Sequence, residues 1–401
     1  MNKRLRIRVG LSDADIVGST NKALQAAVDY VGKLGGGIVE IGPGVYLMED
    51  SLHLHSGVHV IGNGEKTVLK KADGASSLLA TDGDYGEEQI TVSDDIGLAP
   101  GKGVTIGYEG CHGFHTTVAT VLAQIDSHTF TINKPLGNDY VISRKARAQT
   151  TFPIISGYYL NDVIVENLAI DGNAENNPPM GGCRGAGVFF YRVNNARISN
   201  VKVTEFNGDG ISYQQSHDVV VEDCTILGCK GHGFHPGSGS QRTIVRRCVV
   251  HNSGGDGMFV CWRVQHGLFE DNEFVGSGAT GISIGHKDTD NVFRRNLIAE
   301  NRSHGVLFRN EPVVLAAHRN RFEENRVINN GTGEDASGFY VGGETCDITI
   351  VGNVIADTRS PAERTQRYGV YVGAKARNVR VEDNEMSGHV VQDVFYEAKQ
   401  A

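Results

Sequence analysis

Long apolar runs are missing from this 401-residue chain, and most of it also lacks the periodicity of helices. No stretch approaches the roughly 18 apolar residues of a membrane-spanning helix, so we expect no membrane partner. Between its short apolar segments the second half has no room for the helix of about 10–15 residues that a βαβ unit needs. These two absences exclude a doubly wound parallel sheet and favour an all-β protein.

A disulfide framework, a basic surface and a secretory leader are missing as well. The seven cysteines are scattered and odd in number, which does not fit paired bridges. The formal net charge of −9 argues against nucleic acid as a partner. The basic start at residues 1–6 is not followed by an apolar segment, so no signal peptide is visible. Localisation therefore stays open: cytoplasmic for the chain as it stands, secreted or periplasmic if a leader has been removed.

A glycine followed by alternating apolar residues recurs down the second half of the chain. The first six copies are separated by steps of 23, 23, 24, 24 and 24 residues, and two more follow at 33 and 31. The copies are Gly187-Val-Phe-Phe, Gly210-Ile-Ser-Tyr, Gly233-Phe-His-Pro, Gly257-Met-Phe-Val, Gly281-Ile-Ser-Ile, Gly305-Val-Leu-Phe, Gly338-Phe-Tyr-Val and Gly369-Val-Tyr-Val. A fixed period of this length indicates stacked units, none of which can bury its apolar face alone.

A second pattern runs in step with the glycines. A short strand pattern ends at nine regularly placed residues: Asn167, Asn200, Cys224, Cys248, Asn272, Asn296, Asn325, Asn353 and Asn384. An inward amide at the same bend of every coil can bond to the amides above and below it, which satisfies buried polar groups. Cysteine is compact enough to take the same place.

The two patterns together predict a right-handed parallel β-helix of roughly ten coils. Helical spacing over residues 21–33 predicts an amphipathic helix that caps the first coil. Residues 80–150 break the rhythm, and their short alternating segments predict a small inserted antiparallel β subdomain. We therefore divide the chain into a cap with the first coils (1–79), the insertion (80–150) and the main β-helix with its closing C-terminal segment (151–401).

Register places candidate chemistry on one outward face, because residues at matching positions of adjacent coils lie about 4.8 Å apart. Asp209, His232 and Asp256 precede the repeat glycine in three successive coils, and His235 follows on the strand. We expect these four to be catalytic. We expect nine further residues to bind substrate: Gln214, Trp262, Arg263, His286, Lys287, Asp288, Arg309, Glu311 and Tyr340.

Other outward residues allow more than one interpretation. Phe259, Leu307, Tyr340 and Tyr371 form an aromatic and apolar column that suits either sugar stacking or a homo-oligomer interface. The run Cys111-His-Gly-Phe-His offers three metal ligands on one loop without a fourth, which is weak evidence for zinc. The metal requirement stays unknown, with calcium on the acidic column as the alternative to basic side chains for neutralising a carboxylate.

Three runs resemble the catalytic module of bacterial mannuronan C5-epimerases, within the pectate-lyase-like β-helix enzymes: Leu168-Ala-Ile-Asp-Gly-Asn, Gly231-His-Gly-Phe-His-Pro and Asp256-Gly-Met-Phe-Val. The family motif Tyr-Gly-Phe-Asp-Pro-His aligns with His232-Gly-Phe-His-Pro-Gly. Its Tyr, Asp and His thus fall on His232, His235 and Gly237, and the Asp of its next coil falls on Asp256. The resemblance implies a β-helix enzyme with its chemistry at this place. Fragments such as Asn207-Gly-Asp-Gly also resemble polygalacturonases, but the paired Asp-Asp of that family is missing.

Three functions follow from these residues, all with a polysaccharide or oligosaccharide as partner. The first is abstraction of the C5 proton of a uronic acid unit, by a lyase or an epimerase, with His232 and His235 handling protons and Arg309, Lys287 or Arg263 binding the carboxylate. The second is glycoside hydrolysis by Asp209 and Asp256, two coils and about 9–10 Å apart, with Asp288 and Glu311 as other candidates. The third is a non-catalytic glycan-binding β-helix.

Overall fold

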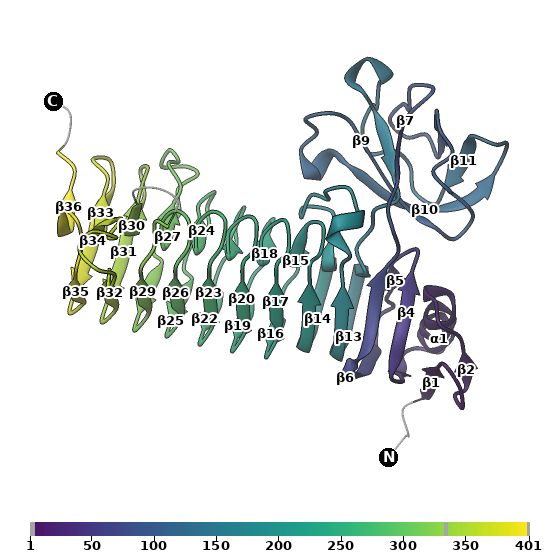
Figure 1. Ribbon diagram of the computed structural model, residues 1–401, viewed down its shortest axis with the longest axis horizontal. Helices are drawn as coiled ribbons and strands as arrows, with labels where there is room; N and C mark the ends of the chain where they lie inside the picture. The colour runs from purple at the N-terminus through teal and green to yellow at the C-terminus, as the bar shows by residue number, and fades with distance from the viewer. Residues whose placement is uncertain (1–4, 333–335, 399–401) are drawn as a thin grey trace.

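The computed structural model describes residues 5–332 and 336–398, and most of these residues form an elongated stack of coils (Figure 1). In this part of the chain a single sheet contains 30 strands, and the strands of consecutive coils pair in parallel. The predicted all-β parallel β-helix is therefore confirmed. No helix in the described ranges has the length and apolar character to cross a membrane.

The first coils are closed at one end by the expected helix. Helix α1 (Asn21–Lys33) covers the end of the stack with the apolar side chains of Leu24, Val28 and Val31 buried. Thr20 occupies its N-cap position but forms no side-chain capping bond. The strands of this part are β1 (Arg6–Gly10), β2 (Ile16–Val17), β3 (Gly37–Ile41), β4 (Gly44–Met48), β5 (Leu52–His53) and β6 (Val58–Lys71).

Two long strands, β13 (Ile155–Asp171) and β14 (Ala186–Thr204), continue the stack after the insertion, with the 3-10 turn η3 (Ala174–Asn176) between them. Strand β14 pairs in turn with strands of three different faces, which shows how each coil bends twice. The later coils have one short strand on each face.

The first face, which carries the candidate site, consists of β15 (Asp209–Gln214), β18 (Phe234–Gly237), β21 (Met258–Phe259), β24 (Ile282–Ile284), β27 (Val306–Phe308), β30 (Ala336–Val341), β33 (Gln366–Val372) and β36 (Gln392–Tyr396). The second face consists of β16 (Val219–Glu222), β19 (Ile244–Arg246), β22 (Leu268–Glu270), β25 (Val292–Arg294), β28 (Arg321–Glu323), β31 (Cys346–Val351) and β34 (Arg377–Glu382). The third face consists of β17 (Thr225–Leu227), β20 (Val249–His251), β23 (Glu273–Val275), β26 (Leu297–Ala299), β29 (Arg326–Ile328), β32 (Val354–Ala356) and β35 (Glu385–Ser387). The ends of the predicted units at 1–4 and 399–401 lie outside the described residues.

The inserted subdomain stands beside the first coils as a separate sheet (Figure 1). Its antiparallel sheet has the strand order β7-β12-β9-β10-β11-β8. Its core of apolar side chains is separate from the core of the coils. The strands are β7 (Ser76–Leu78), β8 (Gln89–Thr91), β9 (Gly103–Gly107), β10 (Thr117–Gln124), β11 (Thr129–Ile132) and β12 (Arg147–Gln149), with the 3-10 turns η1 (Gly113–His115) and η2 (Ile142–Arg144). The first and last strands of the subdomain, β7 and β12, lie side by side because they pair with each other.

An amide ladder runs through the bends between the second and third faces. Asn272 Nδ2 donates to Asn296 Oδ1 at 3.0 Å, Asn296 to Asn325 at 2.9 Å, and the series continues through Asn353 to Asn384. Each amide also donates to a backbone carbonyl of the preceding coil, so it joins three coils. Cys224 and Cys248 are buried at the corresponding positions, as the sequence predicts.

The prediction that Asn167 and Asn200 belong to this ladder is wrong. Asn167 and Asn200 have positive φ angles of 56° and 51° and bond to each other outside the core. The register places the next residues, Leu168 and Val201, in line with Cys224. In these coils asparagine serves the left-handed turn, a conformation it tolerates, and the inward place belongs to an aliphatic side chain.

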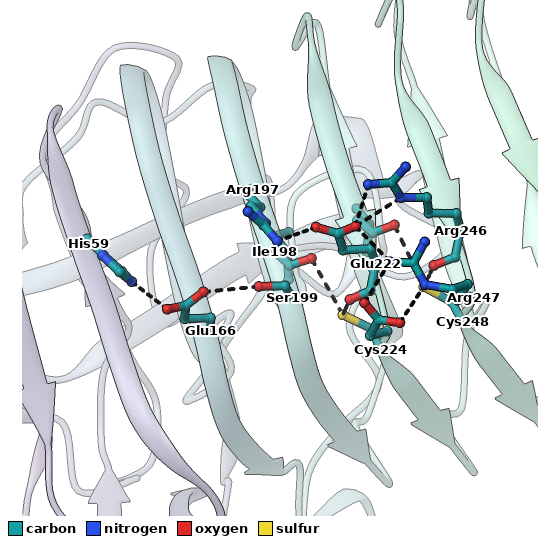
Figure 2. Close-up of polar contacts among 12 residues, drawn as sticks. His59, Glu166, Arg197, Ile198, Ser199, Glu222, Cys224, Arg246, Arg247 and Cys248 are labelled. Carbon is teal, nitrogen blue, oxygen red and sulfur yellow. Dashed lines mark hydrogen bonds and ion pairs between the residues drawn. The ribbon is translucent and has the colours of Figure 1, made fainter.

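The second face carries carboxylates held by arginines of neighbouring coils (Figure 2). The buried Glu222 accepts from Arg246 and Arg247 and pairs with Arg197 at 2.6 Å. Figure 2 also shows the neighbouring contacts from His59 through Glu166 to Ser199. Because these pairs link successive coils, they fix the register of this face as the amides fix the bends.

We expect Asn296→Ala to lower the free energy of unfolding by at least about 3 kcal/mol, because it leaves several buried donors and acceptors without partners at about 1–3 kcal/mol each. Urea unfolding followed by circular dichroism measures the change. Asn200→Gly is the matched control, since glycine keeps the left-handed turn and the side chain is exposed. Equal stability of the two variants would contradict a role for the ladder.

Candidate active site

The outward column of the first face is in the predicted register. Ser212 pairs with His235, the following coil brings Phe259 beside it, and Phe259 pairs with Ser283. The rings of His235 and Phe259 are 5.1 Å apart between centroids. The strand pairing therefore converts residues 24 positions apart in the sequence into neighbours.

Asp209 and His235 form a buried pair. His235 Nδ1 lies 2.8 Å from Asp209 Oδ2, and only 5% and 4% of the two side chains are exposed. The other carboxylate oxygen of Asp209 accepts the backbone N–H of His232 at 2.8 Å. Burial alone would raise the pKa of Asp209, but the charges and hydrogen bonds of the two histidines outweigh it, so the pKa is lowered. An ionised Asp209 fixes the proton of His235 on Nδ1 and leaves Nε2 with a free lone pair.

In His232 the proton is on the other ring nitrogen than in His235. The Nδ1 of His232 accepts the backbone N–H of Asp256 at 2.9 Å, so this nitrogen carries a lone pair and the proton of the neutral ring is on Nε2. The carboxylate of Asp256 is farther away, at 3.4 Å. The side chain is 27% exposed, and its ring stacks on Phe259 at 4.5 Å, 5.8 Å from the ring of His235. Neither Nε2 has a hydrogen-bond partner among residues 5–332 and 336–398.

Asp256 lies behind His232 and does not reach it through a short bond. Its Oδ1 accepts the backbone N–H of Thr280 at 2.9 Å. Burial raises the pKa of Asp256, and the nearby charges of His232 and Arg309 oppose the rise only in part. The backbone N–H of Asp256, more than its carboxylate, therefore determines which nitrogen of His232 carries the proton.

Arg309 occupies the centre of the next coils. Its guanidinium lies 4.6 Å from the Phe259 ring and donates to Ser283 Oγ at 2.9 Å and to the Val260 carbonyl at 2.8 Å. Its contact with the buried Asp288 is longer, at 3.5 Å. These partners occupy most of the N–H donors of Arg309. The side chain therefore supplies a fixed positive charge and is not free to bind a carboxylate through two hydrogen bonds.

His286 and its neighbours form the open edge of the cluster. His286 Nε2 lies 2.8 Å from Glu311, and its ring stacks on the exposed Trp262 at 4.8 Å. Burial and the charge of Arg309 lower the pKa of His286, although Glu311 opposes them. Trp262, His286 and Glu311 are thus brought together with Arg309, as the sequence predicts.

The remaining predicted residues are either buried beneath the surface of this cluster or lie apart from it. Gln214 lies on the first face, as predicted, but its side chain bonds to Ser212 and the residue is only 1% exposed. Asp288 is also buried, and its carboxylate accepts the backbone N–H groups of Val264 and Gly285. Neither side chain reaches the surface where a substrate would lie.

Three further residues are exposed or lie in other cavities. Arg263 lines a cavity of about 450 Å³ with Gln241, and Tyr340 lines another of about 500 Å³ with Lys375. Lys287 is exposed. Tyr340 stacks on Tyr371 at 4.9 Å, which continues the aromatic column toward Phe395.

A loop of residues 180–185, the covering loop, packs against Asp209. Ser212 Oγ donates to the Gly182 carbonyl at 2.7 Å, and a side chain at Gly182 would overlap the Asp209 carboxylate. The Asn and Gly runs near residues 173–182 predict a loop, but not that it packs against the candidate site. The available signal was Gly181-Gly182 in the long step between β13 and β14, where the chain leaves the repeat.

No group of three or more His, Cys, Asp or Glu side chains is placed to hold a metal ion in the described part of the chain. Cys111, His112 and His115 belong to this part, so the weak zinc pattern does not form a site. The two-carboxylate column of Asp209 and Asp256 is interrupted by His232. Calcium stays a prediction of the sequence.

The family model for the right-handed beta helix region matches residues 154–261 and 239–398, which together span more than half of the chain. This chain is a right-handed β-helix protein. No curated protein sequence matches it. Among solved structures, the β-helix is similar to the A-module of mannuronan C-5 epimerase AlgE4 from Azotobacter vinelandii, with 16% identity, a TM-score of 0.59, and 98% of this chain and 100% of that chain covered.

Two further structures resemble the β-helix. The A-module of mannuronan C-5 epimerase AlgE6 from the same organism has 15% identity, a TM-score of 0.55 and 95% coverage of both chains. The Dettilon tailspike protein has 12% identity, a TM-score of 0.57, and 95% of this chain and 68% of that chain covered. At these identities the likeness shows the fold. It confirms the β-helix fold that the resemblance implies.

We expect Asp288 to make stability depend on pH, because burial raises its pKa to about 7. The folded protein then binds a proton that the unfolded chain has released, so stability falls as pH rises from about 4 to about 7. Thermal melting at a series of pH values measures this slope. Asp288→Asn should melt lower at every pH, since an amide cannot accept both backbone bonds, but with a flatter slope. An unchanged slope would refute the prediction.

Proposed function

We propose that this β-helix protein is a carbohydrate-active enzyme that abstracts the C5 proton of a uronic acid unit in a polysaccharide or oligosaccharide. The observation that carries the proposal is the complementary state of two adjacent imidazoles. His235 presents a lone pair at Nε2, and His232 presents a proton at Nε2, with ring centroids 5.8 Å apart. The similar A-modules belong to mannuronan C-5 epimerases, which supports the same class of reaction.

In the proposed reaction His235 Nε2 takes the proton from C5, and Asp209 stabilises the imidazolium that forms. The electron pair of the C5–H bond moves into the carboxylate group of the sugar as an enolate. The fixed charge of Arg309 and the polar edge formed by His286 favour that negative charge. His232 then delivers its Nε2 proton, water returns a proton to that nitrogen, and His235 releases the proton it took, so both rings end neutral.

The destination of that proton decides the product. If it goes to the bridging oxygen at C4, the C4–O bond breaks and a C4=C5 double bond forms, which is a lyase reaction. If it goes to C5 from the other side, no bond of the polymer breaks and the configuration inverts, which is an epimerase reaction. Both outcomes use the same base and the same donor, so the two imidazoles serve either one.

Glycoside hydrolysis is less well supported by this geometry. Both oxygens of Asp209 already accept hydrogen bonds, and its pKa is lowered, so it is a poor proton donor to a glycosidic oxygen. Asp256, with a raised pKa, would have to act without a second free carboxylate at its side.

The test is a panel of uronate polymers, followed by ultraviolet absorbance for the unsaturated product and by deuterium uptake at C5 in heavy water. We expect His235→Gln to lower the rate about 10²–10⁴-fold, because the base is lost. Asp209→Asn should have an effect of similar size, since the amide no longer holds the productive tautomer. His251→Gln on the third face is the matched control and should keep full activity.

The possible results separate the three functions. Reducing ends without unsaturation or deuterium would identify a hydrolase. Full activity of His235→Gln on a true substrate would exclude the proposed base. Glycan binding without turnover, kept in His235→Gln, would identify a binding protein.

A further inference from the structure

A cavity of about 380 Å³ lies where the inserted subdomain meets the coils, away from the histidine pair. Three parts of the chain line it: Lys134 from the subdomain, Tyr158 on β13 and Tyr191 on β14, and Arg184 from the covering loop. Its size lies in the range of small-molecule sites, about 300–1,000 Å³. The sequence gives no reason to connect these residues.

The cavity combines aromatic rings with cations. Lys134 Nζ lies 3.8 Å from the centroid of the Tyr158 ring, and the Arg184 guanidinium lies 5.6 Å from that of Tyr191. Tyr159, which is 65% exposed, meets Tyr191 edge to face at 5.7 Å. The rings offer apolar faces to a sugar, and the cations offer donors to an anion.

The two cations have no carboxylate partner within the described residues, although the chain carries a net charge of −9. Cations on the second face behave differently: Arg242, Arg247 and Arg295 each form a two-pronged pair with an aspartate of a neighbouring coil. These three exposed arginines are paired, whereas the partly buried cations of this cavity have no carboxylate partner among the described residues.

Leaving Lys134 unpaired is costly, because its surroundings disfavour the charge. Burial, together with the nearby Arg184, lowers the pKa of Lys134 to about 8 despite the opposing charge of Asp50. The Asp50 carboxylate is already bonded to Thr120 and His53. An external anion would supply the missing partner.

The cavity lies on the same face as the histidine pair. Tyr158 pairs with Tyr191, Tyr191 with Gln214, and Gln214 with Gly237 at the end of the His235 strand. The two places are thus separated by two to three coils, or about 10–15 Å. The covering loop connects them, since it carries Arg184 and also packs against Asp209.

We propose that this cavity is a subsite for an acidic sugar residue, in which Lys134 and Arg184 bind the carboxylate and the tyrosines contact the ring. The subsite rests on the proposed function in one respect: the sugar residue it holds belongs to the same oligosaccharide, of which a unit farther along the chain reacts at His235. It assigns the inserted subdomain a direct role in choosing a polyanionic substrate.

The test measures binding, independently of turnover, by calorimetry with trisaccharides of galacturonate, glucuronate and mannuronate, and with the same trisaccharides after reduction of their carboxyl groups. The protein carries His235→Gln throughout, so that no product forms. We expect Lys134→Gln and Arg184→Gln each to weaken binding of the best acidic trisaccharide at least tenfold, with no change for its reduced, neutral form. Tyr191→Ala should weaken both.

Lys145→Gln is the matched control, because it removes the same charge from the same subdomain where Lys145 pairs with Glu109 on the surface. It should leave binding unchanged, and melting temperatures check that all variants fold. Equal affinity of Lys134→Gln and its parent for the acidic trisaccharide, or no binding of any acidic trisaccharide in the panel, would overturn the subsite. Loss of binding in Lys134→Gln with full activity in a variant that carries only His235→Gln would keep the subsite and reject the proposed base.

Discussion

Parallel pairing of each coil with the next is the constraint on which the rest of the structure depends. It sets a spacing of about 4.8 Å between equivalent residues, and it leaves buried polar bends that must bond along the stack. The amide ladder from Asn272 to Asn384 meets that need inside, and the pairs around Glu222 meet it on the second face. A stack held at so many points keeps the outward side chains fixed, which a catalytic pair requires.

The same pairing sets the protonation of the candidate site. The backbone N–H of Asp256 points at His232 Nδ1 only because the coil of Asp256 is pinned beneath the coil of His232. The backbone N–H of His232 reaches Asp209 in the same way, one coil away. Two identical side chains thus differ in the position of their proton through the group that each Nδ1 meets, the Asp209 carboxylate at His235 and the Asp256 backbone N–H at His232.

The repeats made the coils, the capping helix and the shared face of His232, His235 and Arg309 predictable, because each depends on local period and on a uniform spacing. The prediction failed by one position at Asn167 and Asn200, where a turn asparagine and an inward asparagine have the same local pattern. It also failed to foresee that Gln214 is buried and bonds to Ser212, since alternation along a strand gives the direction of a side chain but not its exposure. The contact between Lys134 and Tyr158 could not be predicted from the sequence, because it depends on how the insertion packs on the coils.

The strands at which the insertion leaves and rejoins the coils, β7 and β12, are partners in one sheet, and its apolar core is its own. Because a segment attached in this way has its own core, its length and sequence can change while the parallel pairing of the coils is kept. Relatives with the same coils and a different insertion would then keep one chemistry while accepting different polymers. In this architecture substrate range and reaction type can evolve separately.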